Sequence, residues 1–293
     1  MNTWSDHAKG LMLAFTGILV LTPDSLLVRL IETDTWTLLF WRGLFTFLTL
    51  AAYVVLTRPG RLTQTFTKMT RKEWGVGILF AINTILFVVS IRNTSVANTL
   101  VILSTAPLVS AVMSSLFLGE HAPLRTWLTA ILGVVCIAII MGGSIGETNL
   151  LGDSAAVGVA ITLGSNLTLL RHGHSTGTGI EDPLPYLAIG GLLAALMVLP
   201  WAAPFSLTGL NWLYAVLLGC VVMPVSFMFT SKAPRYLPAP EVGLIFLLET
   251  VLGPLWVWLV LNEVPPTLTF IGGAILLTAL AAHTALALRA GEN

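Results

Sequence analysis

The stretch from Leu237 to Pro266 is a long apolar run that holds Glu249 near its centre and Glu263 at its end. The same arrangement occurs earlier in the chain, between Ala97 and Pro123. A shift of 143 positions lays the earlier Glu120 on Glu263. Because this shift is about half of the 293 residues, the sequence predicts two related halves.

Composition indicates the solvent in which such a chain folds. Apolar residues make up 56% of it and charged residues only 10%. A single soluble core of ordinary shape cannot bury that much apolar surface, so the solvent is predicted to be a lipid bilayer. The formal net charge is zero. This argues against nucleic acid as a partner, because binding to phosphates needs a basic surface.

Ten apolar runs are each long enough for a spanning helix, which needs roughly 20 residues. In the first half they cover residues 10–30, 36–56, 74–92, 97–118 and 126–143, and in the second half 153–171, 184–204, 210–231, 240–261 and 267–288. The predicted fold class is an all-α polytopic membrane protein with ten transmembrane helices. Five belong to residues 1–150 and five to residues 151–293.

Basic residues predict the orientation, because they are retained on the cytoplasmic side near helix ends. With the N-terminus inside, eleven of the 14 Lys and Arg residues are cytoplasmic, and only Arg29, Arg42 and Arg92 are not. Both termini are therefore expected in the cytoplasm. Five helices per half is an odd number, so the second half enters from the opposite side, and the repeat is predicted to be inverted. Arg29 and Arg171, which end the first and sixth helices, match at an offset of 142.

Several short strings resemble one known family. They are Arg235-Tyr236-Leu237-Pro238-Ala239, Leu248-Glu249, Pro254-Leu255-Trp256 and Leu261-Asn262-Glu263, which together look like the second repeat of the EamA domain in the drug/metabolite transporter superfamily. Leu118-Gly119-Glu120 is similar to the end of the first repeat, and Gly152-Asp153 to the opening of the sixth helix. Within this family the chain looks most like bacterial amino-acid exporters of the YddG type.

This resemblance implies two EamA repeats, residues 1–150 with the first five helices and residues 151–293 with the last five. It also implies alternating access, in which the two halves rock around a cavity lined by helices one, three, four, six, eight and nine. No nucleotide-binding Walker pattern occurs, so ATP is not expected to be the direct energy source.

Glu249, Asp24 and Arg42 lie well inside the expected spans and are candidates for function, because charges there are costly. Glu249 lies about 16 Å from the inner end of its helix. It could couple transport to protons, contact the ammonium group of a substrate, or bond a neighbouring helix as a structural acid. Asp24 and Arg42 both lie about 9 Å deep on consecutive antiparallel helices. They are expected to form an internal ion pair, with an outer gate or carboxylate binding by Arg42 as alternatives.

Uncharged candidates for substrate binding share faces of expected helices, because spacings of three, four and seven coincide on a helix. They are Phe80, Asn83, Thr84 and Phe87 on the third helix, Ser104 and Pro107 on the fourth, Ser165 and Asn166 on the sixth, and Phe227 on the eighth. Packing seams are the alternative for the small residues. Pro23, Pro107, Pro224 and Pro254 should free the carbonyls of Leu19, Leu103, Cys220 and Thr250.

The function expected from these features is export of amino acids, neutral or aromatic ones favoured, or of similar small metabolites, across the bacterial inner membrane. Alternatives are a carrier of drugs or other metabolites on the same fold, an intramembrane enzyme, and a passive channel or lipid scramblase. No enzymatic activity, cofactor or metal is expected. His172 and His174 are two histidines with no further ligand nearby, which makes a poor metal site. A monomer is compatible with the sequence.

Overall fold

The computed structural model of the chain describes residues 6–57, 69–118, 124–142, 149–175, 182–230, 232–233, 236 and 239–289. Every regular element in these ranges is a helix, in agreement with the expected all-α class. The first half forms α1 (Asp6–Leu21), α2 (Asp24–Leu30), α3 (Thr35–Thr57), α5 (Arg71–Asn93), α6 (Val96–Leu103), α7 (Ala106–Leu118) and α8 (Leu124–Gly142).

The second half repeats this helical content with more irregular turns. It forms α9 (Leu150–Ser175), α10 (Leu184–Val198), the 3₁₀ turns η1 (Leu199–Trp201) and η2 (Pro204–Ser206), α11 (Leu210–Val216), the π-helix η3 (Leu217–Val222), α12 (Met223–Thr230), α13 (Ala239–Leu261) and α14 (Thr267–Arg289).

Seven stretches of the described chain are helical, long and apolar enough to cross a membrane. They are Ala8–Leu30, Thr35–Thr57, Arg71–Asn93, Val96–Phe117, Leu150–Leu169, Leu184–Trp201 and Leu210–Thr230. Helices α8, α13 and α14 contain the shorter apolar stretches Thr126–Met141, Ile245–Leu261 and Thr267–His283. The chain is therefore a multi-pass membrane protein, while the count of ten spans stays a prediction.

Local hydrogen bonds explain where several helices begin. Thr70 and Glu73 form a reciprocal capping box at the start of α5. The Ser95 hydroxyl accepts the N–H of Asn98 at the start of α6, at 3.0 Å. Asp34 accepts the first free N–H groups of α3 in the same way. Each cap satisfies backbone donors that have no partner inside the helix.

Two of the spanning stretches are each broken into two helices. The first breaks at Thr22 and Pro23, between α1 and α2. Because Pro23 has no N–H, the carbonyl of Leu19 instead accepts the hydroxyl of Thr22, at 2.9 Å. The other break, at Ser104 and Thr105, separates α6 from α7 just before Pro107.

The two remaining intrahelical prolines act differently. Pro224 follows η3, whose wider π-helical turns absorb the missing hydrogen bond within the stretch from α11 to α12. Pro254 lies inside α13, which continues through it as one helix. The stretches that contain Pro23 and Pro107 are thus broken, while those that contain Pro224 and Pro254 stay helical.

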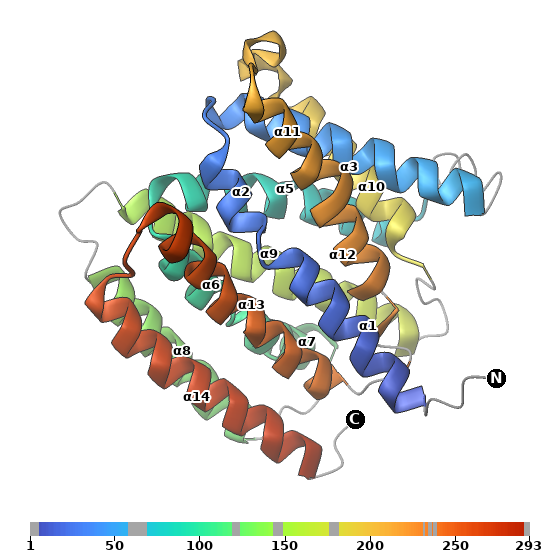
Figure 1. Cartoon of the computed structure of the whole chain (residues 1–293). Helices are drawn as coiled ribbons and strands as arrows, with labels where there is room; N and C mark the ends of the chain where they lie inside the picture. The colour runs from blue at the N-terminus through green and yellow to red at the C-terminus, as the bar shows by residue number, and fades with distance from the viewer. Residues whose placement is uncertain are drawn as a thin grey trace.

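Helices from the two halves pack against each other throughout the bundle. In Figure 1, α14 and α8 lie side by side at one edge of the molecule. Helix α3 packs against α10, α5 against α9, α6 against α13 and α1 against α12. The start of α1 and the end of α14 lie at the same end of the bundle (Figure 1).

The main apolar core lies between α2, α3, α5 and η3. Its fully buried members include Val28, Leu39, Ile91 and Leu218. Large apolar side chains also cover the outside of the bundle, and the side chain of Leu56 is 82% exposed. A soluble protein rarely exposes such surface, whereas a bilayer covers it.

Candidate functional site

The strongest polar contact in the interior is the ion pair of Asp24 and Arg42. The guanidinium nitrogens Nη1 and Nη2 of Arg42 donate to the two carboxylate oxygens of Asp24 at 2.7 and 2.9 Å. The side chains are only 4% and 3% exposed. The Pro23 break lets α2 begin at Asp24, which turns the carboxylate of Asp24 toward α3.

Other groups surround the guanidinium of Arg42. The ring of Phe87 lies 5.2 Å from its Cζ, measured to the ring centroid, and Nη2 also lies 3.3 Å from Sδ of Met223. The Nε of Arg42 is buried and has no hydrogen-bond partner in the described part of the chain. The pair thus joins α2, α3, α5 and α12 at one point in the interior.

Glu249 lies near this ion pair on α13. It is half-buried, and both Asp24 and Arg42 act on it electrostatically. Within the ranges that the structure describes, its carboxylate makes no hydrogen bond or ion pair. Because Asp24 already neutralises Arg42, the three side chains together have a net negative charge when all are ionised. A cationic group near Glu249 would balance that charge.

Three of the predicted aromatic and small residues lie on the side of α5 that faces this region. Phe80, Thr84 and Phe87 are buried on α5. The rings of Phe80 and Phe227 meet edge to face, with centroids 5.4 Å apart and planes at 73°. The structure therefore brings Phe80 to Phe227 and Phe87 to Arg42.

The two predicted asparagines instead join α5 to α9. Nδ2 of Asn83 donates to the carbonyl of Val159 and to the hydroxyl of Thr162, both at 3.1 Å. Nδ2 of Asn166 donates to the carbonyl of Val76 at 3.3 Å, while its buried Oδ1 has no partner among the described residues. Both amide nitrogens are used in helix packing, while the amide oxygens make no hydrogen bond to the described residues.

The remaining predicted positions are less enclosed or engaged locally. Ser104 is buried, and its hydroxyl donates to the carbonyl of Val101 at 2.7 Å. Ser165 is half-buried on α9. Pro107 is exposed, because the buried side of α7 is formed by residues such as Leu108 and Ser110. The structure therefore does not enclose the ring of Pro107.

Sequence reasoning missed a polar cluster at the end of the bundle where α2 finishes. Nη2 of Arg29 donates to Oε1 of Glu263 at 3.2 Å and to the carbonyl of Thr94 at 2.7 Å. The same Glu263 oxygen accepts the N–H of Val96 at 3.1 Å. The signal was present, since Arg29 and Glu263 are landmarks of the repeat, but nothing in the sequence paired them with each other.

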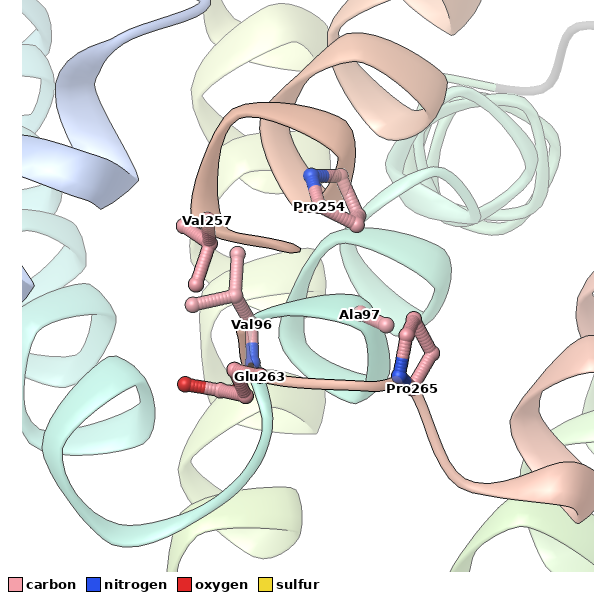
Figure 2. A pocket seen from close by; sticks show the side chains of 6 residues that line it. All are labelled: Val96, Ala97, Pro254, Val257, Glu263 and Pro265. Atoms are coloured by element: carbon pink, nitrogen blue, oxygen red, sulfur yellow. Dashed lines mark hydrogen bonds between the residues drawn. The ribbon is translucent and has the colours of Figure 1, made fainter. Parts of the chain in front are cut away.

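Figure 2 shows a shallow hollow beside this cluster, too narrow to hold a water molecule. Its lining residues are Val96, Ala97, Pro254, Val257, Glu263 and Pro265. The hollow lies between the start of α6 and the end of α13. It is therefore too small for any amino acid.

A second missed network surrounds Asp153 at the start of α9. The hydroxyl of Thr94 and Nδ2 of Asn98 donate to Oδ1 of Asp153 at 2.6 and 3.0 Å. The hydroxyl of Thr269 donates to the amide oxygen of Asn98. This network ties α9 and α14 to the turn between α5 and α6, which gives the Gly-Asp string a structural role.

Among the described residues, no three of His, Cys, Asp and Glu gather as a metal site would need. The side chains of His172 and His174 lie outside the described residues. His283, the histidine inside an expected span, has its Nε2 3.0 Å from the hydroxyl of Thr126. This contact joins α14 to α8.

With this geometry in view, similarity to known proteins becomes informative. The sequence profile of the EamA-like transporter family matches twice, at residues 8–142 and 150–284. The chain belongs to the EamA-like transporter family. The two matches of this EamA-like transporter begin 142 positions apart, so the chain contains two EamA repeats.

Two bacterial proteins are similar in sequence to part of this EamA-like transporter. One is the uncharacterised transporter YdfC of Bacillus subtilis (strain 168), 23% identical over 202 residues, which are 67% of this chain and 65% of YdfC. The match thus spans less than two thirds of YdfC. The other is the pseudopaline exporter CntI of Pseudomonas aeruginosa (strain UCBPP-PA14), 24% identical over 207 residues, 69% of this chain and 71% of CntI.

One crystal structure is similar to this EamA-like transporter over nearly its whole length. The TM-score is 0.65 at 17% sequence identity, covering 96% of this chain and 98% of the other. This likeness concerns the fold alone. Family and relatives point to a transporter rather than an enzyme, while the finer resemblance to YddG-type amino-acid exporters stays a prediction.

Proposed function

We propose that this EamA-like transporter is a secondary exporter of amino acids, or of similar small metabolites, in the inner membrane of a bacterium. The observation that carries the proposal is a cluster of three charged side chains inside the helix bundle of a transporter-family protein. They are Glu249, Asp24 and Arg42. Buried charge inside a membrane bundle is costly and usually serves transport. Both relatives come from bacteria, and one of them is an exporter by name.

We further propose ten spans in two inverted repeats. In an inverted repeat of five helices, α3 corresponds to α10, α8 to α14, and α6–α7 to α13. Each of these corresponding pairs is in contact. The packing of α5 on α9 has its counterpart in the packing of α1 on α12. These paired contacts support a two-fold axis that relates the halves.

Alternating access follows from that symmetry, because rocking of one half against the other opens each end in turn. At one end of the bundle, the ion pair between Arg29 and Glu263 holds the two halves together. With both termini cytoplasmic, as the distribution of basic residues indicates, this is the outer end. The proposed substrate site lies deeper, among Glu249, Phe80, Thr84, Phe87 and Phe227.

Phe80, Phe87 and Phe227 favour a cargo with an apolar part, since aromatic rings supply large apolar contact area. Glu249 favours a cargo with a cationic group. A neutral or aromatic amino acid has both features. A strongly anionic cargo such as a nucleotide would need several Arg or Lys residues, and Arg42 is already paired with Asp24.

Counterflow tests this proposal directly. Purified protein is reconstituted into proteoliposomes loaded with one unlabelled amino acid, and uptake of the radiolabelled form is measured across aromatic, aliphatic, polar and charged members. Saturable accumulation of a neutral subset is expected. No accumulation across the whole panel, in vesicles shown to contain folded protein, would refute amino-acid export.

A second cargo class is supported by the relation to CntI, whose name states export of pseudopaline. Other small metabolites could therefore be cargo on the same fold. Competition of unlabelled metabolites in the same counterflow assay separates the two classes. Metabolites that compete where amino acids do not would favour the second.

A further inference from the structure

The break between α6 and α7 leaves backbone oxygens without their helical hydrogen bonds. Pro107 has no N–H to donate to the carbonyl of Leu103. The N–H of Leu108 donates to the carbonyl of Thr105, at 2.9 Å, rather than to that of Ser104. Two neighbouring carbonyls, those of Leu103 and Ser104, therefore lose the donors that a continuous helix would supply.

Helix α13 runs along this broken helix in the opposite direction. Val257 lies next to Val96 in the hollow of Figure 2. Gly253 lies one turn before Val257 on α13, and Leu100 lies one turn after Val96 on α6. A Cβ atom added to Gly253 would collide with the side chain of Leu100. The same Cβ atom would lie 3.3 Å from the hydroxyl oxygen of Ser25 on α2.

Continuing this register by one more turn locates Glu249. On α13 the next turn back from Gly253 reaches Glu249, and on α6 the next turn forward from Leu100 reaches Ser104. Contacts on the other side give the same level. Ile245 belongs to the same buried cluster as Ile18, which lies four residues before the α1–α2 break at Thr22. Glu249 therefore lies at the level of both helix breaks.

Some of the oxygen atoms at this level have no partner among the described residues. The hydroxyl oxygen of Ser25 is buried and makes no hydrogen bond within the described part of the chain. Glu249 likewise has no partner there. The charged residues nearby are Asp24 and Arg42, which neutralise each other. One uncompensated carboxylate thus remains, with neutral oxygens around it.

We propose that Glu249, the hydroxyl of Ser25 and the carbonyls of Leu103 and Ser104 form a site for a monovalent cation. Broken helices in transporters offer their freed carbonyls to cations in this way. One carboxylate balances a single positive charge, whereas Ca²⁺ takes about six to eight oxygens. The cation is either the ammonium group of the cargo or Na⁺. The ammonium case rests on the proposed export function, while the Na⁺ case does not.

Thermal stabilisation of the purified protein in detergent distinguishes the two sources. Phenethylamine and 3-phenylpropionate, as chloride and choline salts, probe an ammonium group and a carboxylate on the same apolar body. Sodium chloride against choline chloride, at equal ionic strength, probes Na⁺. Stabilisation by phenethylamine but not by 3-phenylpropionate assigns the site to the cargo's ammonium group. Stabilisation by Na⁺ alone assigns it to the ion, and stabilisation by neither overturns the proposal.

Variants tie the binding to the named oxygens. Glu249→Gln keeps the size of the side chain and removes its charge, so affinity for the stabilising cation should fall about tenfold or more. Ser25→Ala should lower the affinity for the same cation by a smaller factor. If Glu249→Gln binds phenethylamine and Na⁺ as the unaltered protein does, the proposed site is wrong.

Pro107→Ala supplies the strictest test, because it changes a freed carbonyl without touching any side chain that the cation meets. The new N–H can donate to the carbonyl of Leu103 and restore a continuous helix. The variant should melt no lower than the unaltered protein and yet bind the cation several-fold more weakly, about the loss of one ligand. Pro224→Ala is the matched control, since that proline lies on α12 beside η3.

The outcomes separate this proposal from the proposed function. Equal weakening in Pro107→Ala and Pro224→Ala would refute the role of the Leu103 carbonyl. Unchanged counterflow of an amino acid in Glu249→Gln, with the same KM, would refute the ammonium site while leaving export standing. Na⁺ stabilisation that needs Glu249, in a protein without amino-acid counterflow, would leave the cation site standing and refute amino-acid export.

Discussion

Gly43 of α3 and Gly191 of α10 bring their backbones together reciprocally. A Cβ atom added to Gly43 would lie 2.5 Å from the carbonyl oxygen of Gly191, and one added to Gly191 would lie 2.9 Å from the carbonyl oxygen of Gly43. Small residues allow such close helix contacts in membranes, where no solvent drives apolar association. This mutual contact lies between α3 and α10, the two helices that the proposed two-fold axis would relate.

Gly43→Ala should therefore destabilise the protein by about 1–3 kcal/mol, because backbone atoms cannot move aside for the added methyl group. Unfolding by titration with sodium dodecyl sulfate measures the change. Gly133→Ala is the matched control, since a Cβ atom there would lie 3.5 Å from the side chain of Leu108. That variant should be neutral or more stable, because Ala is the better helix former. Equal stability of both variants would contradict close packing at Gly43.

The Asp24–Arg42 pair predicts a different stability pattern. Arg42→Met leaves the buried carboxylate of Asp24 without its cation and should cost about 3–5 kcal/mol. Removing both charges, in Asp24→Leu with Arg42→Met, should recover most of that loss. Arg29→Met serves as the comparison, because the side chains of its pair are 23% and 27% exposed and such pairs contribute about 1 kcal/mol or less. The same unfolding titration reads all three, and a double variant as unstable as Arg42→Met would refute the argument.

The Asp24–Arg42 ion pair could be predicted from the sequence. Asp24 and Arg42 lie on consecutive helices at equal depth, and a rise of 1.5 Å per residue is enough to bring them together. Glu249 likewise became a candidate because of its depth along its helix. Depth along a helix follows from counting residues, so features that depend on depth can be predicted from one sequence.

Contacts between helices distant in sequence could not be predicted in the same way. Periodicity gave the face on which Asn83 and Asn166 lie, but not the helix that this face meets. Both face the α5–α9 contact, where backbone carbonyls are within reach. The bonds of Asp153 with Thr94 and of Thr269 with Asn98 also join distant segments. Such pairings depend on how the whole bundle packs.

We therefore expect that replacing either asparagine lowers the stability of the protein rather than its selectivity for substrates. Asn83→Ala removes two hydrogen bonds between α5 and α9 and should cost about 1 kcal/mol, as such bonds do in membranes. Counterflow competition among amino acids should keep its order of preference. Thr84→Ala, one position along α5, is the comparison for substrate binding. A changed order of preference in Asn83→Ala at unchanged stability would instead indicate direct contact with the cargo.

Asp34, in the loop before α3, predicts a pH dependence. Burial alone would raise the pKa of this carboxyl, but hydrogen bonds from the Thr37 side chain and from the N–H groups of Thr37 and Trp36 outweigh it and hold the pKa below its ordinary value of 3.8. A pKa lowered by folding means that the contribution to stability is complete above pH 3.8 and is lost as the pH falls through the folded-state value.

Asp34→Ala should cost about 1 kcal/mol at pH 7, the usual effect of losing an N-cap. Asp34→Asn keeps an acceptor for the α3 N–H groups, so its melting temperature should fall less than that of the unaltered protein between pH 4.5 and pH 3. Melting in detergent across this range measures both. Glu32→Gln, an acid in the same loop, is the control. Parallel pH profiles for Asp34→Asn and the unaltered protein would refute the cap.

The Arg29–Glu263 contact predicts which end of the bundle is closed. Glu263→Ala removes the ion pair and the bond from the Val96 N–H, so the outward-open population should rise about fivefold, the equivalent of roughly 1 kcal/mol. Ala97→Cys reports it, because Ala97 is 5% exposed here beside the hollow. Its reaction with a membrane-impermeant maleimide, in a background without the native cysteines, should accelerate accordingly.

Glu263→Gln refines this prediction, because the amide oxygen can still accept the N–H of Val96 while the attraction to Arg29 is lost. It should accelerate labelling of Ala97→Cys less than Glu263→Ala does. Asn211→Ala controls for a general loosening of this end, since its side chain bonds the backbone of Glu32 at the same end. Equal acceleration by Asn211→Ala would mean that the end frays as a whole. Faster labelling in the Glu263 variants alone means that the ion pair holds the two halves together at this end.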